Sequence, residues 1–352
     1  MIRAAVIGAG QIAKQHLAAL VSLSKVEVVG VCDLSPIMAE ATADRFGIDS
    51  WYTDYRELLD VAKPDAVHVV TPASTHFAIA RDALDSACHV LVEKPISQEL
   101  AELDELLDAS AAARRWLIED HNYLYNNALR QMLTRRDAGD FGAIRRVDVQ
   151  MNLAIFGSGS RFSDVDLPHP ALHEPMGPVA DFLTHLCYLA HAFVGPHRRV
   201  ESVRLTANDN EPPRENFRAL IAGREAIGTI GFSSDSQPDA FTVRVEGTRM
   251  QMETNLFEVG SLETRLLVGP KPLQPIRNAI SRARAERRNA FGSLKRKLSG
   301  GAGAYEGLWE LVRQFYTRLE IGDEPPIALG EIREVNQLVH DVVQGAASPC
   351  AC

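Results

Sequence analysis

Residues 2–13, with the sequence IRAAVIGAGQIA, decide the fold of this chain. The apolar run Ile2–Ile7 predicts a buried strand, and a G-x-G-x-x-A turn follows it directly. After the turn, apolar residues recur at helical spacing. A glycine permits the tight turn, and the helix N-terminus behind it offers N–H groups to a pyrophosphate. We therefore expect a dinucleotide to bind at Gly8, Gly10, Gln11 and Ile12.

An acidic residue ends the second predicted strand. Val26–Cys32 is rich in valine and stops at Asp33, 25 residues after Gly8. A carboxylate at this place takes the ribose hydroxyls of NAD and repels the 2′-phosphate of NADP. The alternative is that Asp33 caps the helix predicted to begin at Pro36, and both roles can coexist. The pattern favours NAD as the cofactor.

Strands and helices alternate through the first third of the chain, and this pattern predicts a doubly wound parallel sheet. The remaining strands are predicted at 66–70, 89–92 and 116–119, with helices at 36–46, 78–87 and 100–113. Further on, short runs with alternating polarity predict a mainly antiparallel sheet, at 144–155, 200–207, 217–222, 226–233, 241–246 and 249–254. The fold class is α/β. We expect a dinucleotide-binding domain at 1–122, a substrate and oligomerisation domain at 123–345, and a disordered tail at 346–352.

Composition narrows the classes of function. The chain has 352 residues with 37 Lys and Arg against 46 Asp and Glu, a net charge of −9, which argues against nucleic-acid binding. No apolar run is long enough to span a membrane, and the N-terminus enters a strand without a signal peptide. Five scattered cysteines suit reduced thiols. We expect a cytoplasmic enzyme that forms a homo-oligomer.

Three motifs together resemble the Gfo/Idh/MocA oxidoreductases, the relatives of glucose–fructose oxidoreductase and inositol dehydrogenase. Besides the glycine turn, they are Glu93-Lys94-Pro95 and the segment 177–185, GPVADFLTH. The segment departs from the family pattern, with Leu183 in place of a glycine, Tyr188 in place of a second aspartate and Met176 in place of a glycine. The resemblance implies a Rossmann domain, a second domain with an open sheet, a nicotinamide cofactor and sugar or cyclitol substrates.

The resemblance also implies the catalytic residues Lys94, Asp181 and His185. Asp181 and His185 are four residues apart in a predicted helix and so share one face. We expect His185 to act as the base, Asp181 as its partner, and Lys94 as the cation that orients the substrate hydroxyl. Similar enzymes suggest a cis Lys94–Pro95 bond.

Other residues are assigned to the cofactor or the substrate. For the cofactor we expect, in addition, Thr71, Pro72, His76, Glu93 and Lys94. For the substrate we expect Lys94, His121, Asn122, Tyr123, Arg161, Asp181 and His185. His169, His173 and Glu174 lack the spacing of a metal site, and we expect no metal.

Residues 276–298 form a basic segment with eight Lys or Arg and one Glu. Its apolar residues recur at three- and four-residue steps, which predicts an amphipathic helix that Gly292 could divide into two pieces. The ordinary interpretation is a helix that packs on its own domain or on another subunit. The alternative is a contact with an anionic ligand or an anionic membrane surface.

The sequence favours an NAD-dependent oxidoreductase that transfers hydride between a secondary alcohol of a sugar, cyclitol or sugar derivative and nicotinamide. Two alternatives stay open. One is a glycosidase of the same family that uses NAD for a transient oxidation, and the other is a non-catalytic NAD-binding regulatory protein.

Overall fold

The computed structural model describes residues 1–155, 176–207, 214–258, 260–265, 271–299 and 305–347. These residues form two compact units. The first contains residues 1–125 and 305–334, and the second contains 126–304 and 335–352. Four residues of the sequence analysis, Arg161, His169, His173 and Glu174, lie outside the described residues, as do residues 348–352 of the predicted tail. The first two residues of that tail, Ala346 and Ala347, are not disordered but form the end of a helix.

The first unit is built on a parallel sheet, which confirms the predicted Rossmann architecture. Within the described residues the sheet has six strands in the order β3-β2-β1-β4-β5-β6. The strands are β1 (Ile2–Ile7), β2 (Val26–Cys32), β3 (Trp51–Tyr52), β4 (Ala66–Val69), β5 (His89–Val92) and β6 (Leu117–Glu119). The strand order reverses beside β1, so the ligand site of this fold is expected at the carboxyl ends of β1 and β4.

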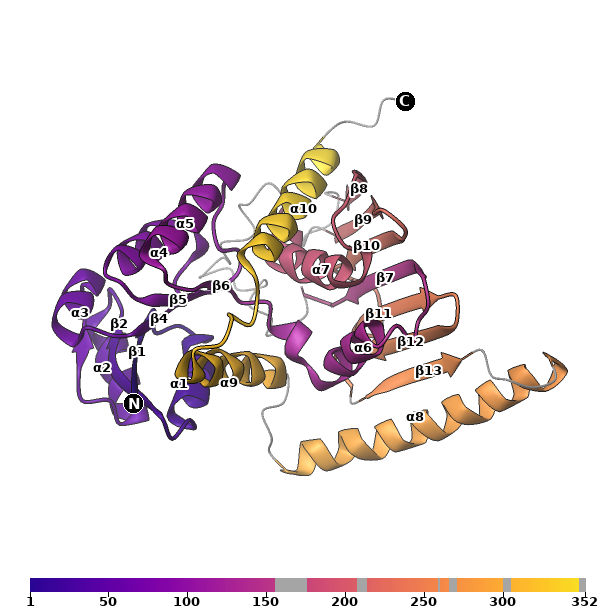
Figure 1. The fold of residues 1–352 in the computed structure, drawn as a ribbon, viewed down its shortest axis with the longest axis horizontal. Helices are drawn as coiled ribbons and strands as arrows, with labels where there is room; N and C mark the ends of the chain where they lie inside the picture. The colour runs from indigo at the N-terminus through magenta and orange to yellow at the C-terminus, as the bar shows by residue number, and fades with distance from the viewer. Residues whose placement is uncertain (156–175, 208–213, 259, 266–270, 300–304, 348–352) are drawn as a thin grey trace. The chain divides into compact units, whose positions relative to one another are not determined.

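Helices connect these strands (Figure 1). They are α1 (Ala13–Val21), α2 (Pro36–Phe46), α3 (Tyr55–Ala62), α4 (His76–Asp85) and α5 (Leu100–Ala113), with the short 3₁₀ turn η1 (Ala73–Thr75). The 3₁₀ turn η2 (Asn122–Tyr125) follows β6, and α9 (Glu306–Ile321), from the later part of the chain, contacts α1 and η2. The predicted helix at 78–87 begins two residues earlier. The sequence reading missed β3 and α3, although the Asp54 side chain accepts a hydrogen bond from the Arg56 N–H and caps α3.

Ser35, and not Asp33, is the N-cap of α2. The Ser35 hydroxyl accepts from the Met38 N–H at 3.4 Å, and Gly47 ends the helix in the left-handed conformation. The capping alternative for Asp33 is therefore wrong, because α2 begins at Pro36, two residues later than a helix capped by Asp33 would begin.

The second unit has a mixed sheet that is mainly antiparallel, as predicted. Its described part holds seven strands in the order β13-β12-β11-β7-β10-β9-β8, and β7 and β10 pair in parallel. The strands are β7 (Ile144–Asn152), β8 (Arg199–Ala207), β9 (Arg214–Ala222), β10 (Ile227–Ser233), β11 (Ala240–Gly247), β12 (Met250–Asn255) and β13 (Ser261–Arg265). Strand β13 was not predicted from the sequence.

Helices of the second unit include α6 (Asn127–Asp137), α7 (Val179–Val194), α8 (Gln274–Ser299), α10 (Leu329–Ala347), which begins in the first unit, and the turn η4 (Lys271–Leu273). Helix α7 packs across β7, β9 and β10, and nearly all of its side chains are buried. Helix α8 runs unbroken through Gly292, so the predicted division into two pieces is wrong. No helix among the described residues is long and apolar enough to cross a bilayer.

Candidate active site

The glycine turn has the shape that a pyrophosphate requires. Gly8 has φ +107°, and a Cβ at this position would lie 2.6 Å from the Val70 carbonyl oxygen. A Cβ at Gly10 would meet no atom within 4 Å. No side chain caps the N-terminus of α1, whose first N–H groups have no partner within the helix. The backbone at Gly10 is therefore open to an anionic ligand at a positive helix end.

Asp33 lies beside this turn at the carboxyl end of β2. One carboxylate oxygen accepts from the Ala9 N–H at 2.9 Å, and the other accepts from the Ser35 N–H at 2.9 Å. The two hydrogen bonds hold the carboxylate next to the glycine turn. Each oxygen keeps a further lone pair for a ribose hydroxyl.

His76 joins the two loops that follow β4 and β5. Its Nδ1 lies 2.7 Å from the Pro95 carbonyl oxygen, and its Nε2 lies 2.8 Å from that of Thr71. Both partners are carbonyl oxygens and therefore acceptors. His76 is buried and contacts the backbone of Thr71 in one loop and of Pro95 in the other. The Lys94–Pro95 bond is cis, as predicted.

A buried ionisable network lies beneath these loops. His16 of α1 contacts three groups: its Nδ1 lies 2.8 Å from His68 Nδ1, and its Nε2 lies 3.2 Å from Glu93 Oε1 and 4.0 Å from Asp120 Oδ2. His68 Nε2 lies 3.0 Å from the Tyr316 hydroxyl. The network connects α1, β4, α9 and the ends of β5 and β6. The sequence analysis placed none of His16, His68 and Asp120 in the candidate site.

The two carboxyl groups of the network have opposite pKa shifts. Burial and the charge of Glu93 raise the pKa of Asp120 well above its usual range. Burial also raises the pKa of Glu93, but the hydrogen bond and the charge of His16, with Lys94, outweigh it and lower the pKa. Burial lowers the pKa of His68 well below its usual value. A proton is therefore held on Asp120, a carboxylate on Glu93 and a neutral ring on His68.

The network also contains donors that a metal ion could bridge. One ligand atom each from His16, Glu93 and Asp120 lies within 4.8 Å of the other two. In the structure these atoms are joined by hydrogen bonds from His16 to Glu93 and between Glu93 and Asp120. Sharing of a proton therefore accounts for the cluster without an ion.

Helix α7 carries the remaining predicted catalytic residues. His185 is buried, and its Nδ1 lies 2.9 Å from the Tyr188 hydroxyl. The two rings meet edge to face. Asp181 is half-buried and lies one turn earlier on the same helix. The departure from the family pattern at Tyr188 therefore supplies a hydrogen-bond partner to the imidazole. This role was missed in the sequence, where Tyr188 marked only an absent aspartate.

The predicted substrate residues after β6 differ in exposure. His121 is fully buried, and its Nε2 lies 2.9 Å from Glu119 Oε2. Asn122 and Tyr123 in η2 are half-exposed. Lys94, which follows β5, belongs to the first unit, and Asp181 and His185 belong to the second.

The family of the first unit follows from its sequence. Residues 2–121 match the model of the oxidoreductase family with an NAD-binding Rossmann fold, Gfo/Idh/MocA. This region belongs to the Gfo/Idh/MocA oxidoreductase family. The resemblance inferred from the glycine turn and Glu93-Lys94-Pro95 is thereby confirmed.

Known proteins resemble the chain over different lengths. D-glucoside 3-dehydrogenase of Escherichia coli is 32% identical over 143 residues, 40% of this chain and 41% of that protein. Glycosyl hydrolase family 109 protein 2 of Akkermansia muciniphila is 34% identical over 146 residues, 37% of this chain and 31% of that protein. The chain thus matches less than half the length of each. An oxidoreductase structure from Agrobacterium radiobacter, in complex with NAD⁺, L-tartaric acid and magnesium, has a TM-score of 0.78 at 15% identity, over 99% of this chain and 96% of that one. This likeness shows the fold.

Proposed function

We propose that this protein is an NAD-dependent dehydrogenase that oxidises a secondary alcohol of a sugar, a cyclitol or a sugar derivative. The arrangement of Asp33 carries the proposal, because its carboxylate is held against the N–H of Ala9 in a glycine turn whose next position, Gly10, is open. Membership of residues 2–121 in an oxidoreductase family supports the reaction class. We also propose that the enzyme is cytoplasmic.

The cofactor would bind across the carboxyl ends of the parallel strands. Gly8, Gly10, Gln11 and Ile12 would hold the pyrophosphate, and Asp33 the adenine ribose. Thr71, Pro72, His76 and Glu93 would set the loops beside the nicotinamide. The negative charge of Asp33 favours NAD over NADP, because the 2′-phosphate would meet a carboxylate.

The chain's own groups handle the hydroxyl proton. When bound, the nicotinamide accepts a hydride from the alcohol carbon. The Lys94 ammonium stabilises the developing alkoxide and so lowers the cost of losing the proton. We assign proton removal to Nε2 of His185, because Tyr188 engages its Nδ1. Asp181 supports the charge that His185 acquires. Asn122 and Tyr123, with His121 and Arg161, are proposed for substrate contacts.

The test is a panel of sugars, uronates, cyclitols and nucleotide sugars, followed by the absorbance of NADH. We expect NADH to form with a member of the panel, and Lys94→Ala and His185→Ala to lower kcat by about 100-fold or more. NADH should bind more tightly than NADPH, and Asp33→Ala should reduce this preference. Unchanged turnover in both alanine variants would overturn the assignment of the catalytic residues.

A second function is favoured by the similarity to a glycosyl hydrolase family 109 protein. A glycosidase of this kind would oxidise and re-reduce its substrate on one bound NAD. Release of NADH in the steady state distinguishes the two functions. If a glycoside is cleaved and no NADH accumulates, the glycosidase is correct and the dehydrogenase is not.

A further inference from the structure

Helix α8 turns its apolar side chains away from the sheet on which it packs. It lies along β13 (Figure 1), and Asn289 on its inner face lies against Gly260. The inner face also carries the half-buried Ala285. The apolar residues that predict a packed helix are exposed instead: Ile276 by 57%, Ile280 by 47%, Phe291 by 67% and Leu294 by 55%.

These four side chains form one stripe along the helix, which we name the apolar stripe. At 100° per residue, Ile276 and Leu294 point in the same direction five turns apart. Ile280 and Phe291 lie within about 60° of that direction. Ala285 and Asn289 point to the opposite side. Arg287 is exposed and points about 20° from Ile276, so it interrupts the stripe between Ile280 and Phe291. An apolar stripe with basic residues on the outer face of a helix is typical of helices that lie in a membrane interface.

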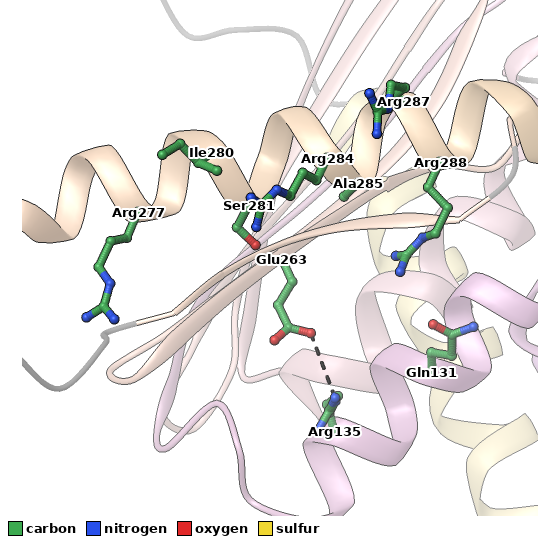
Figure 2. Close-up of a pocket in the computed structure, with 10 residues that line it drawn as sticks. All are labelled: Gln131, Arg135, Glu263, Arg277, Ile280, Ser281, Arg284, Ala285, Arg287 and Arg288. Atoms are coloured by element: carbon green, nitrogen blue, oxygen red, sulfur yellow. Dashed lines mark ion pairs between the residues drawn. The ribbon is translucent and has the colours of Figure 1, made fainter.

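A row of arginines runs beside the stripe. Arg277, Arg284 and Arg288 follow one another at seven- and four-residue steps, about 80° to 120° around the helix from Ile276. All three are exposed and line a cavity of about 960 Å³ between α8, β13 and α6 (Figure 2). Arg287 of α8 and Arg135 of α6 bring the guanidinium groups of the lining to five, and Arg135 lies 3.9 Å from Glu263, the one carboxylate among the described lining residues. The cavity is therefore strongly positive.

We propose that α8 binds the surface of a membrane rich in anionic phospholipid. The apolar stripe would enter the boundary of the acyl chains, while the arginine row holds lipid phosphates through bidentate hydrogen bonds. The charge distribution supports this orientation: residues 276–298 carry +7, so the remaining residues, at −9 − 7 = −16, are repelled by the same surface. This inference does not depend on the proposed dehydrogenase activity.

The charged and apolar residues of α8 also argue against two other partners for this surface, a second copy of the chain and a nucleic acid. Two copies of the chain that pair through the apolar stripe would bring two arginine rows close together, at a cost in repulsion. A nucleic acid would satisfy the arginines but leave Phe291 and its neighbours in water. An anionic bilayer is the partner that satisfies both features at once.

Co-sedimentation of the full chain with lipid vesicles tests the proposal. We expect binding to phosphatidylcholine vesicles that contain about 30 mol % phosphatidylglycerol, and at least tenfold weaker binding to pure phosphatidylcholine. Phe291→Asp should weaken binding to the mixed vesicles at least tenfold, by placing a charge in the stripe. The double variant Arg284→Ala/Arg288→Ala should weaken it about tenfold or more and reduce its dependence on salt.

Matched controls separate this surface from general effects. Val61→Asp changes an exposed apolar residue of α3, and Arg224→Ala removes an exposed arginine between β9 and β10. Both should bind like the unchanged chain, and circular dichroism should show every variant folded. Equal binding to both kinds of vesicle, no binding to either, or binding by the Phe291→Asp variant at full strength would overturn the proposal. Concentration-dependent self-association that Phe291→Asp abolishes would assign the stripe to a second copy instead.

Discussion

Two glycines in one turn have different tasks, and this difference can be measured. Gly8→Ala places a Cβ against the Val70 carbonyl at a positive φ, so we expect a loss of about 3 kcal/mol in the free energy of unfolding. Gly10→Ala places its Cβ in open space, so the melting temperature of this variant should equal that of the unchanged chain. NADH should bind about tenfold more weakly to the Gly10→Ala variant, because the methyl group occupies the approach of the pyrophosphate. Thermal unfolding and NADH fluorescence titration check both variants. Unchanged NADH affinity in Gly10→Ala would contradict the placement of the cofactor.

Tyr188 is a positioning residue for His185 in the proposed reaction. Tyr188→Phe removes the hydroxyl that lies 2.9 Å from His185 Nδ1 and keeps the ring. The loss of one hydrogen bond costs about 1 kcal/mol, so we expect kcat to fall about fivefold, with a shifted pH profile and an unchanged affinity for NADH. Tyr125→Phe is the matched control, because it removes a hydroxyl bonded to the Pro326 carbonyl oxygen. If kcat and its pH profile are the same in both variants, Tyr188 has only a structural role.

At the scale of single residues, the sequence predicted which residues belong to the candidate site better than it predicted their hydrogen-bond partners. The glycine turn and Asp33 follow from a fixed spacing, since backbone geometry dictates which residues such a turn accepts. The hydroxyl of Tyr188 was not recognised, because a hydrogen bond between residues three apart on a helix depends on rotamers that no spacing reveals. The network around His16 joins residues up to 248 positions apart, so only folding brings them together.

At the scale of elements, the buried network makes the attachment of α1 to the sheet sensitive to pH. Asp120 keeps its proton in the folded chain and releases it near its ordinary pKa when unfolded. Its contribution to stability is therefore full at low pH and declines as the pH rises above about 4, by at most about 1.4 kcal/mol per pH unit. Glu93 has a lowered pKa and loses its contribution only as the pH falls below its ordinary value. Between pH 5 and pH 8, of these two effects, only the decline in stability caused by Asp120 remains.

Asp120→Asn tests this network, because the amide keeps a donor for Glu93 and has no proton to release. We expect the stability of the variant, relative to the unchanged chain, to rise from pH 5 to pH 8 in urea unfolding. Asp60→Asn, at an exposed position of α3, should leave the pH dependence unchanged. Parallel pH profiles for the chain and Asp120→Asn would show that Asp120 is ionised in the folded protein.

Elements with a strong pattern were predicted and weak ones were missed. Strands β2 and β5 and helix α5 were predicted with their bounds, because they have continuous apolar runs or clear helical spacing between turn residues. Helix α6 was missed, since its signal is a capping Asn126 whose side chain accepts from the Ala128 N–H, and few of its residues are apolar. The helical pattern of α8 was recognised, but the pattern alone does not say which face meets β13.

At the scale of the whole molecule, the chain crosses between its units more than once. Residues 305–334 return to the first unit, where Tyr316 of α9 contacts His68, and residues from 335 onward join the second. The sequences of α9 and α10 contain no local signal for the unit on which each helix packs. Which surface accepts a helix is decided by the tertiary complementarity of both partners.

The outer face of the second sheet predicts self-association. Val203 and Leu205 of β8, Leu220 of β9 and Ile227 of β10 share this face by strand register, opposite the residues that α7 covers, and all four are exposed. An apolar face of this kind is typical of an interface between subunits. Sedimentation velocity should therefore report a mass above the 38.6 kDa of one chain. Leu205→Asp, at a side chain exposed by 67%, should reduce the measured mass toward that of a single chain, because a charge would be buried at the interface. Ile280→Asp in the apolar stripe should leave the mass unchanged, and a single-chain mass for the unchanged protein would contradict this use of the sheet.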